Sequence, residues 1–518
     1  MTRPGANDAR FVSWRVDGPA LNSYADDGDY LGCAHTEDVD CRWDDIMVLS
    51  PARNVVNLAT HDSGGTLENA HKGITASGAS LEWIYILRGS RPAKVRLDTM
   101  ALVNSGIFQT EVMTDVLATK SANGTYEVTF ASDNTALLHV TSIGATTDTT
   151  SSNNQTEEFR ILGRGAKKGT SQQIIGLGGN AHHQGIYSNI LSGSVTMDAS
   201  AWTELLTLTG DDITFTGFGL DGSFQILGTS KGPYYFNELR LTYEPMFEEL
   251  RMDESLEHSR IIEHWSFLGA IITFRDGIRW WSSGESASFG LEAYNKNSSP
   301  VKGRPTAVCA DRKWLYIVYY DDEADDSWLT AWRFRQSGDP GTELIVGYTI
   351  GFLDGIACRF LTNVGNGNGT RTNPAIVGGH DGNMFYWVKG RDVYGRWDDA
   401  GYTFQTSGTW YGTEWRGLPR KRKNIEFFEL TVENCDSDQT VALSVSVDGG
   451  TAIQCGATIF TNGLHRLYFQ DRGFPVGGQR IKPQVALAGT STNSPRIRGP
   501  IRMAYTVTDL EIDGEKRP

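Results

Sequence analysis

Short apolar segments joined by tight turns recur along the middle of this chain. Residues 271–274 are mainly apolar, the turn Asp276-Gly277 follows, and residues 278–281 end in two tryptophans. Residues 376–387 repeat this order around the turn Asp381-Gly382. An Asp-Gly pair favours positive φ at both central positions of a two-residue turn, and the twist of such a turn matches that of paired strands. Both segments therefore predict β-hairpins.

Further strands of this type are predicted across residues 51–405. They cover residues 54–58, 81–89, 93–97, 126–130, 136–143, 173–177, 224–228, 232–236, 313–320 and 328–334. Several units follow one another at roughly 40–50 residues, a spacing typical of the four-stranded blades of a β-propeller. We therefore expect an all-β protein in which residues 51–405 form a six- or seven-bladed β-propeller. Residues 1–50 are irregular and polar, and they are predicted to form an N-terminal arm that packs on a neighbour.

The pattern changes in the C-terminal part of the chain, residues 406–518. Residues 441–447 alternate between apolar and small side chains and end at the turn Asp448-Gly449-Gly450. Short apolar segments before and after them cover residues 425–432, 464–469, 481–487 and 501–507. Several short strands at close spacing predict an antiparallel β-sandwich as a C-terminal domain.

Composition and charge narrow the classes of function. The chain has 518 residues, of which 39% are hydrophobic and 21% charged, and its formal net charge is −15. The length predicts at least two domains, and the negative charge argues against a long surface that follows a phosphate backbone. No apolar run approaches the ~20 residues of a membrane-spanning helix. The polar N-terminus does not resemble a secretory signal, so we expect a chain made in the cytoplasm.

Six cysteines are scattered along the chain without a Cys-x-x-Cys pair. This spacing predicts buried free thiols and no zinc site. His182 and His183 lie in a glycine-rich turn with no third ligand nearby, so they are interpreted as a loop feature. Residues 398–404 partly match the Asp-box of sialidase-type propellers, which is a structural turn.

The densest acidic run comprises Asp321, Asp322, Glu323, Asp325 and Asp326. Because it lies between two aromatic strands, it is predicted to be a solvated hairpin tip; a calcium site is the alternative, since hard cations take several carboxylates. The common hydrolase and nucleotide-binding motifs (G-x-S-x-G, H-E-x-x-H and the P-loop) are missing from the sequence. We expect no catalytic, cofactor or metal site, and the chain is not predicted to be an enzyme.

One basic run stands out in this acidic chain: Arg416, Arg420, Lys421, Arg422 and Lys423. These residues are a candidate contact with DNA phosphates or with an acidic partner surface. The alternative is a charged turn at the edge of the sandwich, where basic side chains prevent edge-to-edge pairing. The sequence leaves both interpretations open.

Several segments of the second half of the chain are similar to one family. They are GTSKGPYY at 228–235, DDAG at 398–401, TSGTW at 406–410, GLPRKRK at 417–423, LSVSVDGG at 443–450 and RGPIRMAY at 498–505. Their order resembles virion structural proteins of tailed bacteriophages that combine a β-propeller with a β-sandwich, such as tail-nozzle, packaged-DNA-stabilising and minor tail proteins. The resemblance covers roughly residues 220–510, and it assigns no functional residue because the role of the family is assembly.

The resemblance implies a non-enzymatic structural component of the tail or head–tail junction of a phage particle. Such a protein would assemble as a symmetric ring with copies of itself and other virion proteins, and it would contact packaged DNA. The alternative is a carbohydrate-binding or glycan-cleaving propeller that recognises a host surface glycan. Exposed tryptophans such as Trp280 and Trp281 stack on sugar rings, although neighbouring strand residues point to opposite faces, so one of the two is expected in the core.

Overall fold

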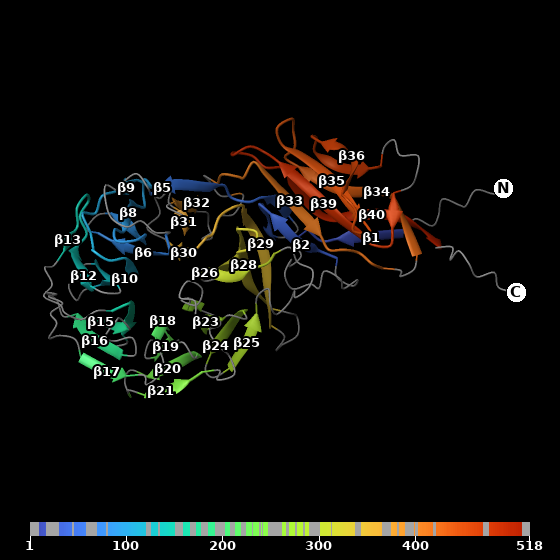
Figure 1. Ribbon diagram of the computed structural model, residues 1–518. Helices are drawn as coiled ribbons and strands as arrows, with labels where there is room; N and C mark the ends of the chain where they lie inside the picture. Colours follow the sequence, from blue (N-terminus) through green and yellow to red (C-terminus); the bar gives the residue numbers. More distant parts are fainter. Residues whose placement is uncertain are drawn as a thin grey trace, which may run out of the picture.

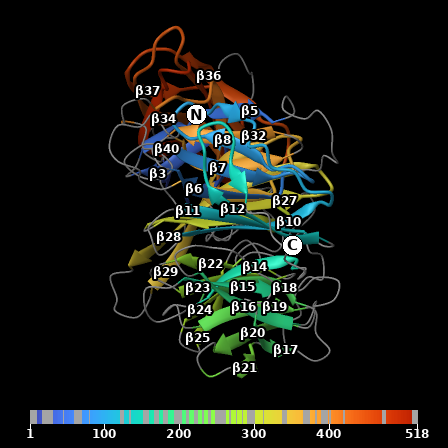
Figure 2. The same ribbon diagram turned by 90° about the vertical axis from the view of Figure 1, so that its left-hand side faces the viewer.

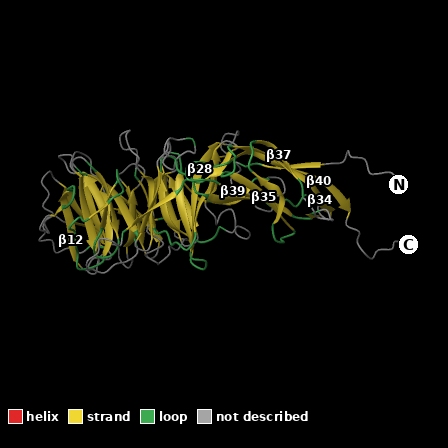
Figure 3. Ribbon diagram, turned by 90° about the horizontal axis from the view of Figure 1, so that it is seen from above, coloured by secondary structure: helices red, strands yellow, loops and turns green. Residues whose placement is uncertain are grey.

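A computed structural model describes most of the chain, and among the described residues every regular element is a β-strand (Figure 3). The all-β class predicted from the sequence is therefore confirmed. The described part of the chain contains no helix long and apolar enough to cross a membrane. The structure describes residues 10–16, 31–43, 46–58, 70–78, 81–120, 126–132, 135–150, 159–165, 172–177, 185–191, 203–207, 213–218, 224–229, 232–237, 240, 242–246, 262–265, 269–274, 277–282, 285–289, 301–311, 313–336, 343–364, 374–380, 383–388, 398, 402–417, 421–469 and 476–509.

Seven four-stranded antiparallel sheets, formed by described residues between 53 and 388, stand around a ring (Figure 1). We call this part the sheet ring. The first strands of neighbouring sheets contact one another all the way round, from β6 to β10, β14, β18, β22, β26, β30 and back to β6.

The first four sheets of the ring are built from consecutive strands. Their strands are β6 Lys72–Ser77, β7 Glu82–Leu87, β8 Ala93–Arg96 and β9 Leu102–Val103; β10 Met113–Lys120, β11 Tyr126–Ser132, β12 Thr135–Ser142 and β13 Thr149–Thr150; β14 Ile161–Gly165, β15 Gln172–Leu177, β16 Gly185–Leu191 and β17 Thr203–Thr207; β18 Ile213–Phe218, β19 Phe224–Thr229, β20 Gly232–Asn237 and β21 Thr242–Pro245.

The remaining sheets contain the hairpins that the sequence predicted. Phe274 pairs with Gly277, whose φ of 136° suits glycine. Gly277 is therefore the first residue of β24 and not a central residue of the turn, as the sequence predicted, and residues 275–276 lie outside the described residues. The strands are β22 Ile262–Trp265, β23 Gly269–Phe274, β24 Gly277–Ser282 and β25 Glu285–Phe289; β26 Arg304–Ala310, β27 Leu315–Asp321, β28 Asp326–Gln336 and β29 Glu343–Leu353; β30 Phe360–Asn363, β31 Pro374–His380 and β32 Asn383–Val388.

One strand from near the start of the chain closes the ring. β5 (Arg53–Asn57) pairs antiparallel with β32 and so completes the sheet of β30, β31 and β32. Met384 lies opposite Val56, and Phe385 lies opposite Val55. Since β5 precedes the ring in sequence and β32 ends it, main-chain hydrogen bonds join the two ends.

Two larger sheets form a second module beside the ring, the two-sheet module (Figures 1 and 3). In sheet A, β40 pairs with β1, β4 and β34, β3 pairs with β4, and β34 also pairs with β37 and β38; sheet B has the order β2-β33-β39-β35-β36. The strands of sheet A are β1 Arg10–Trp14, β3 Val39–Trp43, β4 Ile46–Leu49, β34 Lys421–Glu433, β37 Gly463–Leu467, β38 Gly477–Gly478 and β40 Arg496–Asp509. Those of sheet B are β2 Cys33–Glu37, β33 Ser407–Gly412, β35 Thr440–Val447, β36 Ile453–Ile459 and β39 Ile481–Ala488.

Both ends of the chain meet in the two-sheet module. β1 pairs with β40 and β2 pairs with β33, and Trp14 and Val39 are fully buried. The described residues among 1–50 therefore belong to the two sheets and do not form the separate arm expected from the sequence. The segment shows no clear strand pattern, and its partners are remote: Trp14 Nε1 donates a hydrogen bond of 2.9 Å to Thr413 O, 399 residues away.

A single cluster of buried side chains runs through both parts of the molecule. Phe428 and Met503 contribute to it from sheet A, Val485 from sheet B, and Ile317 and Trp332 from the ring. Burial of apolar side chains is the main favourable term in folding, so the ring and the two-sheet module stabilise each other.

The closing strand β5 provides a direct test of how the ring is held. Val56 packs against buried side chains of the ring, whereas Val55 on the same strand is 60% exposed. Val56→Asp is expected to lower the free energy of unfolding by roughly 2 kcal/mol because it buries an unpaired charge. Val55→Asp is the matched control and is expected to change it by no more than ~0.5 kcal/mol. Thermal unfolding of the two variants measures the difference, and equal midpoints would contradict this account of closure.

Candidate interaction site at the junction and on sheet A

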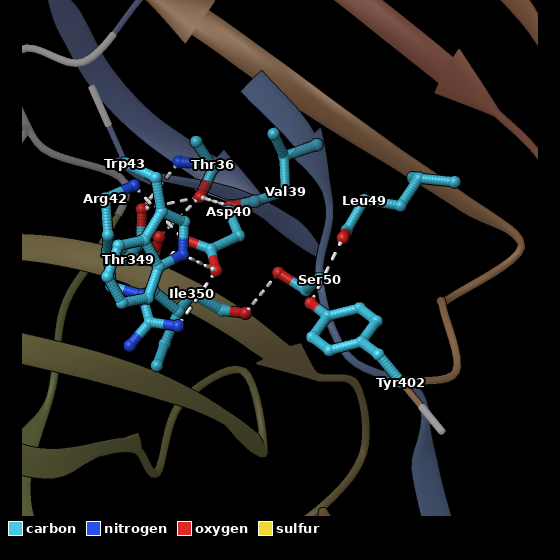
Figure 4. Close-up of polar contacts among 10 residues, drawn as sticks. All are labelled: Thr36, Val39, Asp40, Arg42, Trp43, Leu49, Ser50, Thr349, Ile350 and Tyr402. Carbon is cyan, nitrogen blue, oxygen red and sulfur yellow. Dashed lines mark hydrogen bonds and ion pairs between the residues drawn. The ribbon is translucent and has the colours of Figure 1, made fainter. Parts of the chain in front are cut away.

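β29 is the strand through which the sheet ring meets the two-sheet module. It contacts β2 and β3, and side-chain hydroxyls link the two parts (Figure 4). Thr36 N donates to Thr349 Oγ1 at 2.6 Å, and Thr36 Oγ1 lies 2.6 Å from Thr349 O. Ser50 Oγ donates to Ile350 O at 2.6 Å. These bonds satisfy main-chain groups of β29 where it has no neighbouring strand of its own sheet.

A buried ion pair lies at one end of this junction. Arg42 donates to both oxygens of Asp40, from Nε at 2.9 Å and from Nη2 at 2.8 Å, and both side chains are fully buried. Trp43 Nε1 donates to Asp40 at 3.1 Å. The guanidinium of Arg42 lies 4.9 Å from the ring centroid of Trp43 and 5.1 Å from that of Trp314. Arginine suits this position because its planar group pairs with a carboxylate and stacks on aromatic rings at once.

Two carboxylates lie at the other end of the junction. Asp38 adopts a φ of 53° and accepts a hydrogen bond of 3.1 Å from Phe352 N. Burial raises its pKa to about 6, against the opposing effects of that hydrogen bond and of Arg53. Burial also raises the pKa of Glu37, which accepts a hydrogen bond of 3.3 Å from Tyr411 Oη.

A polar pocket of about 430 Å³ opens beside these carboxylates. Its walls combine hydroxyl, small apolar and acidic side chains with one aromatic ring. The lining residues are Glu37, Asp38, Phe352, Ser407, Gly408, Thr409, Thr440, Ala442, Thr458, Ala486, Leu487 and Ala488. This volume is sufficient for a small polar ligand.

Burial favours the uncharged form of a histidine and a cysteine near the junction. His35 stacks on Tyr411 with ring centroids 4.2 Å apart. Burial and the nearby charge of Lys482 lower the pKa of His35 to about 3. Cys33 and Cys41 are in contact, with their sulfur atoms 4.0 Å apart, and burial raises the pKa of Cys33. All six cysteines are buried and unbridged, as predicted.

The acidic run lies where the sequence placed it, at the tip of the hairpin between β27 and β28. Tyr320 Oη donates to Asp325 Oδ1 at 2.8 Å, and Arg304 Nη2 lies 3.5 Å from Asp322 Oδ2. Within the described residues, no group of three or more His, Cys, Asp or Glu side chains is arranged to hold a metal ion.

The structure separates the residues of the basic run. Arg416 is exposed and pairs with Glu414 at 2.8 Å. Lys421 and Arg422 are exposed at the start of β34, and Arg420 lies outside the described residues. Lys423 is buried: its Nζ donates to Gln479 O and lies 4.9 Å from the ring centroid of Trp415.

The location of β34 bears on both interpretations of the basic run. Lys423 lies opposite Val507 on one side and Gly478 on the other, so β34 is an inner strand at this point. An inner strand needs no protection against edge-to-edge pairing. Burial lowers the pKa of Lys423, and this side chain is not available to a partner.

Of the remaining sequence candidates, His182, His183, Asp381 and Gly382 are outside the described residues. So are residues 399–401 of the Asp-box segment, in which Asp398 is exposed and Tyr402 and Phe404 are buried. Trp280 packs against the large core cluster. Trp281 packs against a second cluster, with its ring centroid 5.4 Å from that of Tyr235. Both tryptophans are thus partly buried.

The outer surface of sheet A carries a group of exposed aromatic and basic side chains that the sequence analysis missed. Phe11 is 60% and Tyr468 50% exposed, and Phe427 lies between them, with ring centroids 6.2 Å from Phe11 and 5.6 Å from Tyr468. We call this surface the arginine–aromatic face, and it consists of Phe11, Phe427, Arg466, Tyr468, Arg498 and Arg502.

The arginines of this face are held by two glutamates. Arg466 Nε lies 2.9 Å from Glu429, and Arg502 Nη1 lies 3.9 Å from the same carboxylate. Arg498 Nε lies 2.9 Å from Glu433. The alternation of Phe427, Glu429 and Glu433 along one strand is the signal that marks this surface in the sequence, since residues two apart share a face.

Comparison with known proteins identifies little. No protein-family model matches the chain, and no curated protein does. Among solved structures there is a distant match to the extracellular domain of the hybrid two-component system BT4673 of B. thetaiotaomicron, with 10% sequence identity and a TM-score of 0.42. The match covers 85% of this chain and 62% of that chain, so this chain spans less than two thirds of that structure.

The pocket carboxylate Asp38 makes the stability of the junction depend on pH. Its pKa of about 6 in the folded chain lies above the ordinary value of 3.8, so the charged form destabilises the folded state at pH 7. Protonation removes this effect as the pH falls from about 7 to about 4. Asp38→Asn, which keeps the hydrogen-bond acceptor, is expected to raise the free energy of unfolding at pH 7 by about 1–2 kcal/mol.

Calorimetry between pH 4 and pH 7 checks this prediction. The Asp38→Asn variant is expected to lose part of the pH dependence of the wild-type chain, and exposed Asp322→Asn is the control that should retain it. An unchanged pH dependence in the Asp38 variant would show that this carboxyl does not titrate in this range.

Lys423 and Arg422 are neighbours whose substitution is expected to have different effects. Lys423→Glu places a carboxylate next to Gln479 O inside the module, and it is expected to lower the free energy of unfolding by about 3 kcal/mol. Arg422→Glu on the exposed side is expected to change it by no more than ~0.5 kcal/mol. Urea unfolding of both variants gives the comparison, and a stable Lys423→Glu variant would rule out the buried position.

Proposed function

We propose that this chain is a non-enzymatic structural component of a tailed phage particle, in the tail or at the head–tail junction, where copies of it assemble into a symmetric ring. In this proposal the sheet ring is a seven-bladed β-propeller and the two-sheet module is a β-sandwich. The resemblance of residues 220–510 to virion proteins of this type supports the assignment to a particle.

The arginine–aromatic face carries the proposal of assembly. The centres of protein interfaces are enriched in aromatic residues and arginine, and truncation of these residue types has the largest effects on binding. Phe11 and Tyr468 are at least half exposed, and Arg466 lies 5.2 Å from the ring centroid of Phe427. This arrangement presents apolar area and hydrogen-bond donors together, as a partner surface requires.

Continuity between the two parts of the molecule also supports a structural role. The shared core and the hydroxyl bonds between β2 and β29 join the ring to the module. A component of a ring must transmit load between its contacts without bending at a linker. A fold with both chain ends in one module and a closed ring beside it meets this requirement.

Glycan binding is the second candidate, and the polar pocket favours it. Serine and threonine hydroxyls together with the Glu37 and Asp38 carboxylates offer hydrogen bonds to sugar hydroxyls, and Phe352 offers an aromatic surface. Trp280 and Trp281, from which the sequence-based version of this hypothesis started, are partly buried against two apolar clusters.

Analytical ultracentrifugation and electron microscopy of the purified chain test the proposed assembly. Closed oligomers are expected, and the double variant Phe11→Ser/Tyr468→Ser is expected to weaken self-association at least tenfold, or about 1.4 kcal/mol per contact. Tyr243→Ser is the matched control, because Tyr243 is a 38% exposed tyrosine on β21 of the ring. Antibody labelling of purified particles is expected to place the chain in the tail or at the head–tail junction.

A different set of results would favour the second candidate. A chain that stays monomeric at all concentrations and binds on a glycan array, with binding lost in Glu37→Gln, would replace the assembly proposal.

A further inference from the structure

The acidic hairpin tip is an exposed anionic surface held in a defined conformation. β27 and β28 remain paired up to Asp321 and Asp326, and residues 322–325 are exposed. Glu323 N donates to Asp321 Oδ1 at 3.1 Å, and Tyr320 Oη holds Asp325. The neighbouring carboxylates of the tip repel one another, and their negative charges add up in the space outside it. A cationic surface placed against the tip would therefore be attracted strongly.

The arginine–aromatic face is basic in a chain whose net charge is −15. Its three arginines, Arg466, Arg498 and Arg502, have side chains 58%, 54% and 54% exposed, while Glu429 between them is only 13% exposed. Glu433 beside Arg498 is 40% exposed, so the accessible layer consists of the three guanidinium groups and this one carboxylate, with Glu429 beneath. Guanidinium groups bind carboxylates through paired hydrogen bonds.

The tip and the face lie at opposite sides of the molecule. Next to the tip, Phe352 is bonded to Asp38 beside sheet B. At the other end of the same ring sheet, Trp314 packs against Trp43 of sheet A with ring centroids 6.1 Å apart. The arginine–aromatic face is the outer surface of sheet A, because Phe428 on β34 points into the core. Figure 2 shows β34, β37 and β40 on one side and β27 on the other.

From this charge complementarity we infer that the arginine–aromatic face of one copy binds the acidic hairpin tip, residues 321–326, of the next copy. The inference rests on the proposed function and names the two surfaces in contact. Two different patches on opposite sides give a head-to-tail contact, which repeats from copy to copy and closes into a ring when the rotation between copies allows it. The aromatic side chains would cover the apolar part of the contact, and the arginines would set its register.

A charge-exchange experiment tests this contact. The face variant is Arg498→Glu/Arg502→Glu, and the tip variant is Asp322→Lys/Glu323→Lys. Each variant alone brings like charges together at every contact, so its self-association is expected to fall at least tenfold. An equimolar mixture restores opposite charges at both kinds of contact, and it is expected to assemble within about threefold of wild type with the two variants alternating.

Salt dependence and a control variant complete the test. Wild-type assemblies are expected to dissociate progressively as the NaCl concentration rises from 0.05 to 1 M, because screening weakens exposed charge pairs. Arg240→Glu/Arg480→Glu makes the same charge change on arginines that are exposed and are not part of this face, and it is expected to assemble like wild type. Thermal unfolding confirms that each variant remains folded.

The outcomes separate this inference from the proposed function. If wild type assembles but the face or tip variant does so equally well, or if the mixture stays dissociated, the contact is wrong and the assembly proposal stands. If the control variant is as defective as the face variant, the contact is likewise wrong. If the wild-type chain stays monomeric under all conditions, both fail.

Discussion

The packing of β29 against β2 and β3 is the contact on which the rest of the structure depends. It brings the outer strand of one ring sheet into the same apolar core as sheets A and B. The hydroxyls of Thr36 and Ser50 donate to main-chain carbonyls of β29, and the guanidinium of Arg42 lies over the rings of both Trp43 and Trp314. Within the ring sheet, Gly347 on β29 leaves room for Trp332 of the neighbouring strand β28, because a Cβ there would lie 2.7 Å from that ring. Without this contact the ring and the module would be independent bodies.

The path of the chain reinforces that contact. The chain starts in the two-sheet module, leaves it to form the ring, and returns to the module, so that β1 pairs with β40 and β5 pairs with β32. Each of these pairings joins segments far apart in sequence. Closing such long loops has an entropic cost that grows only slowly with loop length, and burial of side chains such as Trp14 and Val39 offsets it. The stability of the fold and the closure of the ring therefore depend on contacts between segments from the beginning and the end of the described chain.

Charged side chains inside the fold differ in their surroundings from those on its outer surfaces. Inside the fold, Asp40 is paired with Arg42, burial keeps His35 neutral, and burial raises the pKa of Asp38 without neutralising it at pH 7. On the outside, the hairpin tip carries carboxylates and the arginine–aromatic face carries three exposed guanidinium groups. In the proposed assembly the fold holds these surfaces apart on one copy, so that they can meet only between copies.

The sequence by itself determined the all-β class and the positions of most strands. The hairpin pairing of β23 with β24, the alternation over residues 441–447 and the solvated acidic tip are local features, because turn chemistry and period-two patterns act between near neighbours. Only the tertiary structure decided the partners of the strands in residues 10–50, since a strand pattern does not specify which distant strand it pairs with. It also decided that Lys423 is buried and that Phe427 lies on the outer face of β34. A bulge between Ile425 and Phe427 shifts the register of β34, and this shift leaves Phe427 outside with Phe428 buried. Such a local irregularity changes which face a side chain occupies, and it arises from the pairing of β34 with β40 and not from the strand alone.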